Sequence, residues 1–189
     1  MRTIVLFLLF INVFNSNAQE ADHPEIMDTD TSWTKECFAF PLSFAPSINF
    51  EGYEEALFPP GWSNSDSSTF WSYVFTWRIN STNLLSDSQL EEHLQTYFDG
   101  LMRVQRDGFD PTIVDLDSLG EEFNFSGMVK TTDAFFSKET MLLNVIIHQQ
   151  LCTDLEQLNI VFRFSPKHIE HSVWETLYGP TLPQNFCSH

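Results

Sequence analysis

The chain has 189 residues, with 26 Asp and Glu against 9 Lys and Arg, and a formal net charge of -17 at pH 7. Hydrophobic residues make up 42% of it and aromatic residues 15%, enough apolar surface to offset the entropy that a backbone loses on folding, which excludes a disordered acidic chain. Nucleic acids and anionic lipid surfaces are poor partners for this charge, because proteins bind phosphates mainly through Lys and Arg. We expect one folded domain.

Residues 1–18, MRTIVLFLLFINVFNSNA, are typical of a secretory signal peptide. Arg2 supplies the positive start, an apolar run follows, and Ser16 and Ala18 are the small residues of a cleavage site. A helix over the apolar run would span about 16 Å, roughly half of a membrane core, which disfavours an anchor. We therefore expect an exported protein, in the periplasm or outside the cell, with no transmembrane segment in the mature chain.

The chain after this leader begins with an acidic stretch. Residues 19–36 carry few apolar anchors and predict a flexible acidic N-terminal arm, followed by a single domain over 37–189. Apolar residues at every second position over 38–44 predict a strand, which Pro41 places at a sheet edge. Pro, Gly, Ser, Asn and Asp dominate residues 58–69 and predict a loop.

The clearest local signal is an aromatic strand followed by a helix. Residues 70–79 alternate aromatic and smaller side chains and predict a central antiparallel strand with one aromatic face. The following helix begins at Ser86, which can form a capping box with Gln89, and ends between residues 102 and 105. Its apolar stripe needs a partner, and we expect it to pack on the aromatic face.

The second half of the chain predicts further strands and a closing helix. The strands are expected over 112–117, 123–136, 140–151 and 158–164. Ser165 and Pro166 then predict the start of a final helix over 167–178. Hairpin-length connections favour an antiparallel sheet. We therefore predict an α+β fold, an antiparallel β-sheet covered on one face by two amphipathic helices.

Two resemblances accompany these patterns. The order of elements, with Pro-Gly-Trp at 60–62 leading into a strand and a helix closing the chain, is similar in outline to PsbP/Mog1-like domains. The stretch 58–101, with FPPGW, FWSYVFTW and LEEHLQTYFDGLM, and the closing FRFSPKHIEHSVWETL resemble small exported bacterial proteins with no assigned activity. The first is an analogy of element order, and the second implies export. Neither supplies a catalytic residue.

Three cysteines remain after the leader: Cys37, Cys152 and Cys187. In an oxidising compartment two of them can pair, which leaves three pairings open and one thiol over. We favour Cys152 with Cys187, because that bridge would tie the C-terminal tail to the body of the domain. The alternative is three small buried apolar side chains.

Candidate metal ligands lie in the second half of the chain: His148, His168, His171, Cys152 and Glu170. His168 and His171 are three residues apart on the expected final helix, so they share a face, and His148 on a strand could complete a zinc or copper site. No H-E-x-x-H or C-x-x-C motif is present, which favours a solvated helix face. We expect no cofactor, with a divalent metal as the alternative.

Trp62 and Trp71 are the candidate ligand-binding residues, since ring faces on one strand can form a platform for sugars or other flat ligands. Packing in the core is the competing interpretation. Asn80-Ser81-Thr82 and Asn124-Phe125-Ser126 match the N-glycosylation pattern. We interpret both as chance matches, because the leader resembles those of exported bacterial proteins.

The chain contains no Gly-x-Ser-x-Gly motif and no phosphate-binding loop. These features predict an exported non-catalytic module that binds a protein partner or a small ligand. The first alternative is an extracellular hydrolase whose site is assembled in space from the many carboxylates, and the second is a His-based metal-binding protein. A deep pocket that holds His with Ser, Cys or paired carboxylates would favour the hydrolase.

Overall fold

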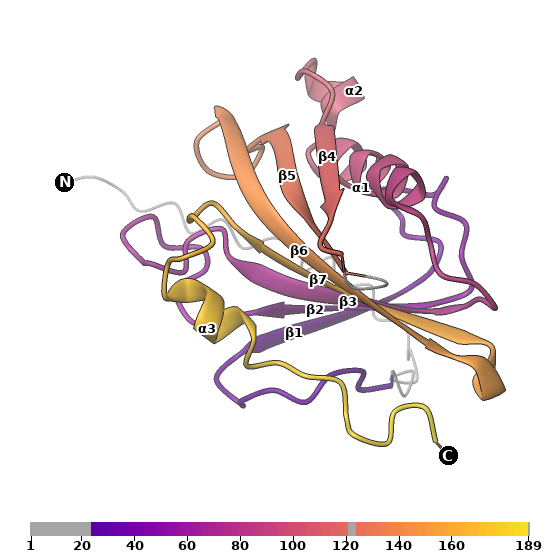
Figure 1. The fold of residues 1–189 in the computed structure, drawn as a ribbon. Helices are drawn as coiled ribbons and strands as arrows, with labels where there is room; N and C mark the ends of the chain where they lie inside the picture. Colours follow the sequence, from indigo (N-terminus) through magenta and orange to yellow (C-terminus); the bar gives the residue numbers. More distant parts are fainter. Residues whose placement is uncertain (1–23, 121–123, 189) are drawn as a thin grey trace, which may run out of the picture.

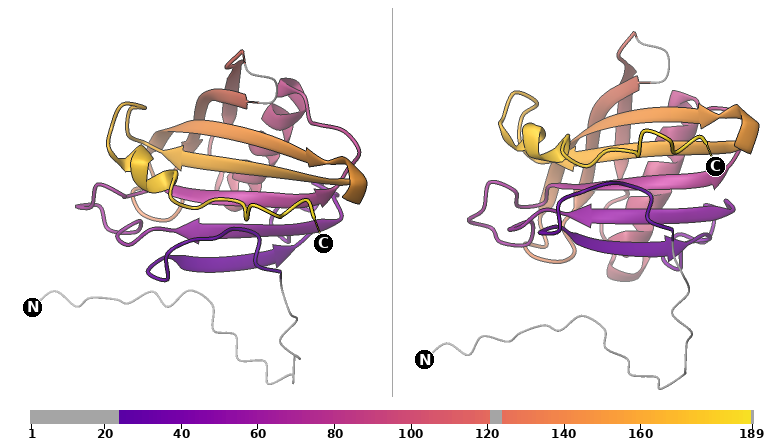
Figure 2. Two further views of the ribbon diagram at one scale, coloured as in Figure 1. Left: turned by 60° about the horizontal axis from the view of Figure 1, so that its bottom comes forward. Right: turned by 90° about the horizontal axis from the view of Figure 1, so that it is seen from below.

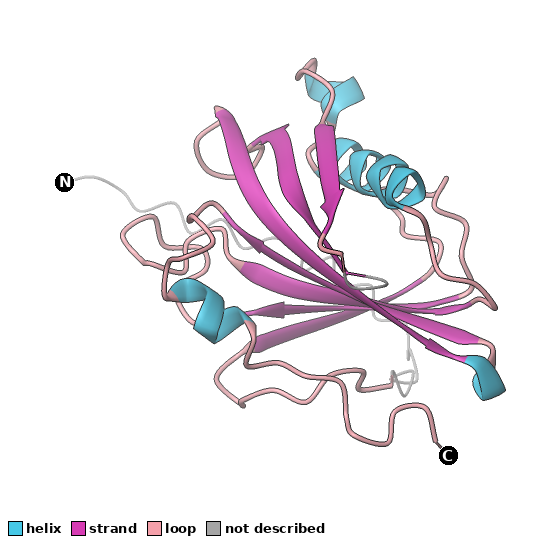
Figure 3. Cartoon of the chain, in the orientation of Figure 1, coloured by secondary structure: helices cyan, strands magenta, loops and turns pink. Residues whose placement is uncertain are grey.

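The computed structural model describes residues 24–120 and 124–188 (Figure 1). The expected signal peptide lies outside them. The described chain forms a 7-stranded antiparallel sheet in the order β1-β2-β3-β7-β6-β5-β4 (Figure 3). The strands are β1 (Thr34–Ala39), β2 (Gly52–Phe58), β3 (Tyr73–Asn80), β4 (Ile113–Ser118), β5 (Asn124–Thr132), β6 (Thr140–Cys152) and β7 (Gln157–Ser165). The helices are α1 (Asp87–Leu101), α2 (Val104–Asp107) and α3 (Val173–Leu177), with a 3₁₀ turn, η1 (Thr153–Leu155), between β6 and β7.

One face of the sheet carries the main core, under α1. β3 turns three aromatic side chains to this face: Tyr73, Phe75 and Trp77. α1 buries four side chains against them: Leu90, Leu94, Tyr97 and Phe98. The ring centroids of Phe75 and Tyr97 lie 4.9 Å apart. The aromatic strand predicted over 70–79 is confirmed from Tyr73 onward, whereas residues 70–72 belong to the preceding loop. The helix that begins after a capping box at Ser86 and covers the strand is confirmed.

The opposite face of the sheet carries a smaller core, under α3. Its buried members are Ile26, Met27, Leu57, Val74, Val161, Val173, Trp174 and Leu177. The segment before β1 completes this cover, since Ile26 and Met27 are 0% and 1% exposed and Asp28 forms an antiparallel bridge with Thr181. Figure 2 shows α3 and the C-terminal segment in front of the sheet and α1 behind it.

The predicted fold class is therefore wrong in the number and placement of its covering helices. A single sheet dominates, α1 and α3 lie on opposite faces, and the predicted final helix over 167–178 shrinks to α3. Side-chain bonds explain the shortening. The Ser165 hydroxyl accepts the Lys167 amide at 3.1 Å, and the Trp174 indole N–H donates to the carbonyls of Lys167 and His168, which holds the preceding chain in turns.

The first strands also differ from the prediction. The strand predicted over 38–44 is wrong beyond Ala39, where β1 ends, and the chain turns from there. β2 is a strand that the sequence pattern does not predict, because Glu54 and Glu55 interrupt its apolar run although both side chains are buried. β2 pairs with both β1 and β3, so these acids lie inside the sheet.

The expected flexible arm over 19–36 lies partly within the described residues. From residue 24 onward it packs on the sheet, and the Met27 amide donates to the Glu55 carboxylate at 2.8 Å. Lys35 forms an ion pair with Glu25 at 3.2 Å. Residues 19–23 lie outside the described part.

A disulfide joins the C-terminal tail to the sheet. Cys152, the last residue of β6, is bonded to Cys187, which lies 35 positions further along the chain, with the two Cα atoms 5.2 Å apart. This is the pairing that we favour from the sequence, and Cys37 on β1 carries a free thiol. None of the helices in residues 24–120 and 124–188 has both the length and the apolar character needed to cross a bilayer.

Candidate functional site

Aromatic rings from two loops contact one another at one end of the sheet. One loop, over 59–72, joins β2 to β3, and the other, over 133–139, joins β5 to β6. The rings are those of Trp62, Phe70, Trp71, Phe135 and Phe136. We call these five residues the aromatic end cluster.

Phe136 is the centre of the aromatic end cluster. Its ring centroid lies 5.3 Å from that of Phe70, 5.7 Å from Trp71 and 6.2 Å from Trp62. Phe135 contacts Trp71 at 5.9 Å. The backbone also connects the two tryptophans, since the Trp71 amide donates to the Trp62 carbonyl at 2.8 Å. The two tryptophans singled out from the sequence therefore belong to one cluster, joined through Phe136.

Phe135 and Phe136 are the most accessible rings of the cluster. They are 42% and 43% exposed, whereas Trp71 is 5% exposed and lies against both. A flat ligand therefore cannot stack on Trp71 as the sequence suggests. The two phenylalanines are missing from the sequence-based candidates because their apolar character places them in the strand predicted over 123–136. The signal that ends β5 before them is Asp133, a residue type that favours turns.

Asp133 fixes the turn that carries the two phenylalanines. Its carboxylate accepts the backbone amides of Phe135 and Phe136 at 2.9 Å and the amide and hydroxyl of Ser137 at 2.8 and 3.0 Å. Burial opposes ionisation, but these hydrogen bonds outweigh it and hold the pKa of Asp133 below its usual value. The Lys138 amide closes the turn by donating to the Asp133 carbonyl at 2.9 Å. These hydrogen bonds therefore hold the backbone of the two exposed phenylalanines in a fixed turn.

Trp71 combines two costly features in one residue. Its φ of 55° lies in the left-handed region, which a bulky side chain rarely adopts, at a cost of about 1–3 kcal/mol. Its indole Nε1 is buried and has no hydrogen-bond partner among the described residues. Backbone strain and unsatisfied buried donors tend to persist at functional sites. Both features therefore mark the end of the sheet where Phe135 and Phe136 are exposed.

A buried acid lies at the other side of the main core. Glu54 on β2 is 0% exposed, and its carboxylate accepts the Trp77 indole N–H at 2.7 Å and the Tyr97 hydroxyl at 3.0 Å. Burial raises the pKa of Glu54 to about 7, although both hydrogen bonds favour the ionised form and oppose this shift. No solvent reaches this carboxyl, so it cannot meet a substrate. Its bonds join β2, β3 and α1.

The predicted histidine site is not assembled. His168 and His171 lie in the turns before α3, both exposed, and each Nδ1 accepts a backbone amide two residues further on, at 3.5 and 3.0 Å. His148 lies on β6, where its Nδ1 contacts the Asn124 side chain. Cys152 is in the disulfide. Across 24–120 and 124–188, no group of three or more His, Cys, Asp or Glu is placed to hold a metal ion.

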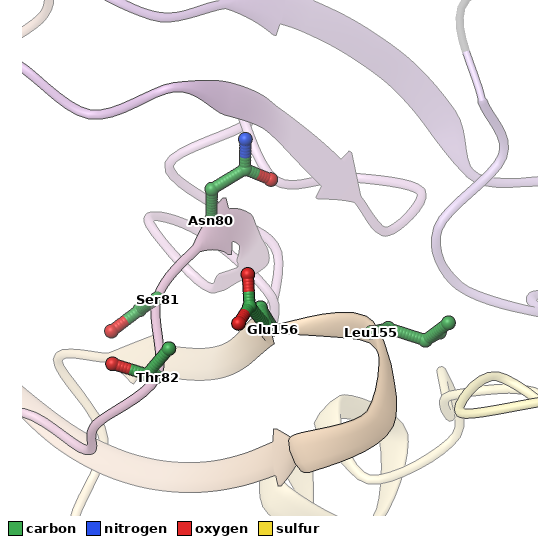
Figure 4. A pocket seen from close by; sticks show the side chains of 5 residues that line it. All are labelled: Asn80, Ser81, Thr82, Leu155 and Glu156. Atoms are coloured by element: carbon green, nitrogen blue, oxygen red, sulfur yellow. The ribbon is translucent and has the colours of Figure 1, made fainter.

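Two open hollows are lined by residues outside the aromatic end cluster. One, of about 420 Å³, is lined by Asn80, Ser81, Thr82, Leu155 and Glu156 (Figure 4). The other, of about 470 Å³, is lined by Glu25, Met27, Asp28, Thr29, Asp30, Thr31, Trp33 and Lys35. Neither lining contains His or Cys, so neither hollow holds a nucleophile activated by His. The second hollow is lined by the carboxylates of Glu25, Asp28 and Asp30, but it is an open hollow and not a deep pocket.

Comparison with known proteins found no match among protein-family models, curated proteins or solved structures. Function is therefore inferred from the geometry of the chain itself.

Proposed function

We propose that the protein is an exported, non-catalytic binding module that docks a protein partner on the aromatic end cluster. The observation that carries this proposal is the pair Phe135 and Phe136, two adjacent exposed rings on a turn that Asp133 holds in place. Clustered exposed apolar side chains mark interaction surfaces, and aromatic anchors supply much of the binding energy at such surfaces.

The shape of the site favours a macromolecule over a small ligand. Small-molecule sites are concave and enclose most of their ligand, whereas these rings stand on a turn between two strands. The partner then supplies an apolar pocket for the rings. Because the chain has a net charge of -17, a partner with a basic rim around that pocket would be attracted to it.

The ordered turn lowers the cost of binding. Phe135 and Phe136 already hold their backbone positions through the Asp133 carboxylate, so little loop entropy is lost on docking. Each ring has somewhat under half of its surface left to bury, which corresponds to about 1 kcal/mol per ring. Loss of both rings should therefore weaken binding about thirtyfold.

The test begins by identifying the partner through the site itself. A photoreactive benzoylphenylalanine replaces Phe136 in the full chain, and cross-linked proteins from the source organism's exported fraction are identified by mass spectrometry. The purified partner is then titrated by calorimetry against the wild type and a Phe135→Ser/Phe136→Ser variant. Ile169→Ser is the matched control, since Ile169 is 44% exposed and lies in the turns before α3.

We expect the double variant to bind about thirtyfold more weakly and Ile169→Ser to bind as the wild type does. Circular dichroism shows whether each variant is folded. Equal affinities of wild type and double variant would refute the proposal, and so would a similar loss in Ile169→Ser.

We place this activity in an oxidising compartment, the periplasm or the extracellular space. The disulfide between Cys152 and Cys187 supports this location, because such bonds persist mainly in exported proteins. The leader-like pattern over 1–18 supports it independently.

A further inference from the structure

We propose that Asn80 is the acceptor of one N-linked oligosaccharide when the chain is exported through a compartment that holds an oligosaccharide transferase. The motif is Asn80-Ser81-Thr82, which on the sequence alone we interpret as a chance match, because the leader resembles those of exported bacterial proteins. The structure adds the location. Asn80 is the last residue of β3 and is exposed, and Ser81 and Thr82 continue into an irregular turn.

The surroundings of Asn80 leave room for a sugar. Asn80 is exposed, and its carboxamide points away from Ser81, Thr82, Leu155 and Glu156, with which it lines an open hollow of about 420 Å³, so a sugar on Nδ2 would extend away from these residues (Figure 4). Its Nδ2 donates to the Glu51 carboxylate in an exposed bond of 3.3 Å. Water can replace such a bond at little cost, so a glycan on Nδ2 disturbs no buried contact.

The second motif differs in its surroundings. Asn124 is the first residue of β5 and pairs with His148 on β6, as Asn80 pairs with Gln157 on β7, but Asn124 is only partly exposed whereas Asn80 is exposed. Its side chain contacts the His148 ring. A glycan at Asn124 would have to displace this contact between two paired strands. The proposal is therefore confined to Asn80, and Asn124 serves as the internal comparison.

The modification requires a lipid-linked oligosaccharide pyrophosphate as donor and a membrane-bound transferase. Asn80 Nδ2 forms a bond to the anomeric carbon of the first sugar, while the bond from that carbon to the pyrophosphate oxygen breaks. The lipid pyrophosphate leaves with the electron pair, and the amide proton passes to a base of the transferase. The Thr82 hydroxyl completes the acceptor motif.

The glycan would stand at the end of the sheet opposite the aromatic end cluster. β3 runs from Tyr73, next to Trp71, to Asn80, so about 23 Å of strand separates the two ends. A glycan at Asn80 therefore leaves Phe135 and Phe136 open to a partner. The two proposals are independent, and the glycan assay involves no binding measurement.

The test is secretion of the full chain, with its own first 18 residues, from a eukaryotic host that glycosylates exported proteins. Intact mass of the protein in the medium is measured before and after peptide N-glycosidase, which releases the glycan and converts its asparagine to aspartate. Peptide mass spectrometry then locates the conversion. The variants are Asn80→Gln, Thr82→Ala and, as control, Asn124→Gln.

We expect one glycan, converted at residue 80, absent from Asn80→Gln and Thr82→Ala and retained in Asn124→Gln. An unmodified secreted chain would overturn the proposal, as would a glycan that persists in Asn80→Gln and disappears in Asn124→Gln. Failure of the chain to reach the medium would also overturn it, because the modification depends on export.

Discussion

The buried carboxyl of Glu54 should make the stability of this protein fall between weakly acidic and neutral pH. We choose Glu54→Gln as the perturbation because Gln has the shape of the protonated acid. Its Oε1 can accept the Trp77 indole N–H and its amide can donate to the Tyr97 hydroxyl, which preserves both buried contacts without a charge. The substitution therefore removes ionisation and little else.

The size of the effect follows from the two pKa values. In the folded protein burial raises the pKa of Glu54 to about 7, and its ordinary value is 4.5. Below pH 4.5 the Glu54 carboxyl is protonated in both the folded and the unfolded chain, so its ionisation does not lower the free energy of unfolding. Between these values only the unfolded chain ionises, and the free energy of unfolding falls by about 1.4 kcal/mol per pH unit. The loss is complete above the folded pKa and totals about 3 kcal/mol.

The assay is urea unfolding followed by tryptophan fluorescence from pH 4 to pH 8, with the free energy of unfolding compared between wild type and Glu54→Gln. We expect similar stabilities at the acidic end, and a variant more stable by about 3 kcal/mol at the alkaline end. Burial also raises the pKa of Glu36 and Glu55 and lowers that of His93, but both proteins share these groups and they largely cancel in the difference. The exposed Glu175→Gln should follow the wild type.

A constant difference between wild type and Glu54→Gln across the pH range would refute this reasoning. It would mean that the carboxyl ionises in the folded protein near its ordinary pKa, which is incompatible with a dry environment. If the wild type instead gained stability relative to the variant as pH rises, the direction of the pKa shift of Glu54 would be wrong as well.

Three further predictions concern stability. Asp133→Ala leaves three turn amides without their acceptor and should cost about 1–3 kcal/mol in urea unfolding; an unchanged midpoint would show that the turn holds itself. Cys152→Ser/Cys187→Ser should lower the free energy of unfolding by about 4 kcal/mol, and reductant should lower the stability of the wild type but not that of the variant. Ser86→Ala removes the cap of α1 and should cost about 1 kcal/mol in thermal unfolding, with no loss expected for Ser63→Ala at an exposed loop position.

Local signals predict the central part of the fold well. The alternation over 70–79 and the capping box at Ser86 both describe interactions between residues close in sequence, and the structure keeps them. The packing of α1 on β3 follows because each exposes one large apolar face that must be buried. These elements are recognisable because their pattern and their tertiary role agree.

Long-range contacts decide the elements that the sequence does not predict. From the sequence Glu54 is expected to be solvated. It is buried because its carboxylate accepts hydrogen bonds from Trp77 and Tyr97, which lie 23 and 43 residues away in sequence. No window of local sequence contains the partners of Glu54. The final helix is shortened by contacts that are closer in sequence, since the Trp174 indole N–H donates to the carbonyls of Lys167 and His168, seven and six residues before it, and the helical pattern does not reveal these bonds.

The sequence predicts only some of the residues of the candidate site. Trp62 and Trp71 stand out as large aromatic residues beside a loop, and they do share one cluster. Phe135 and Phe136 look like core residues of a strand, and their exposure depends on the turn at Asp133. The predicted residues, Trp62 and Trp71, therefore pack against the exposed rings. The rings that would contact a partner, Phe135 and Phe136, are not predicted.

The left-handed conformation of Trp71 explains how that support is built. It turns the chain so that the Trp71 amide reaches the Trp62 carbonyl while β3 begins two residues later. Trp62 is thereby brought to 6.2 Å from Phe136. An extended Trp71 would avoid the strain but would carry the loop, and Trp62 with it, away from the turn. Gly would adopt this φ without penalty, but it would lose the Trp71 ring, which is buried in the main core and packs against Tyr73, Phe135 and Phe136. The strain is therefore offset by packing, and it lies at the end of the sheet that we propose for binding.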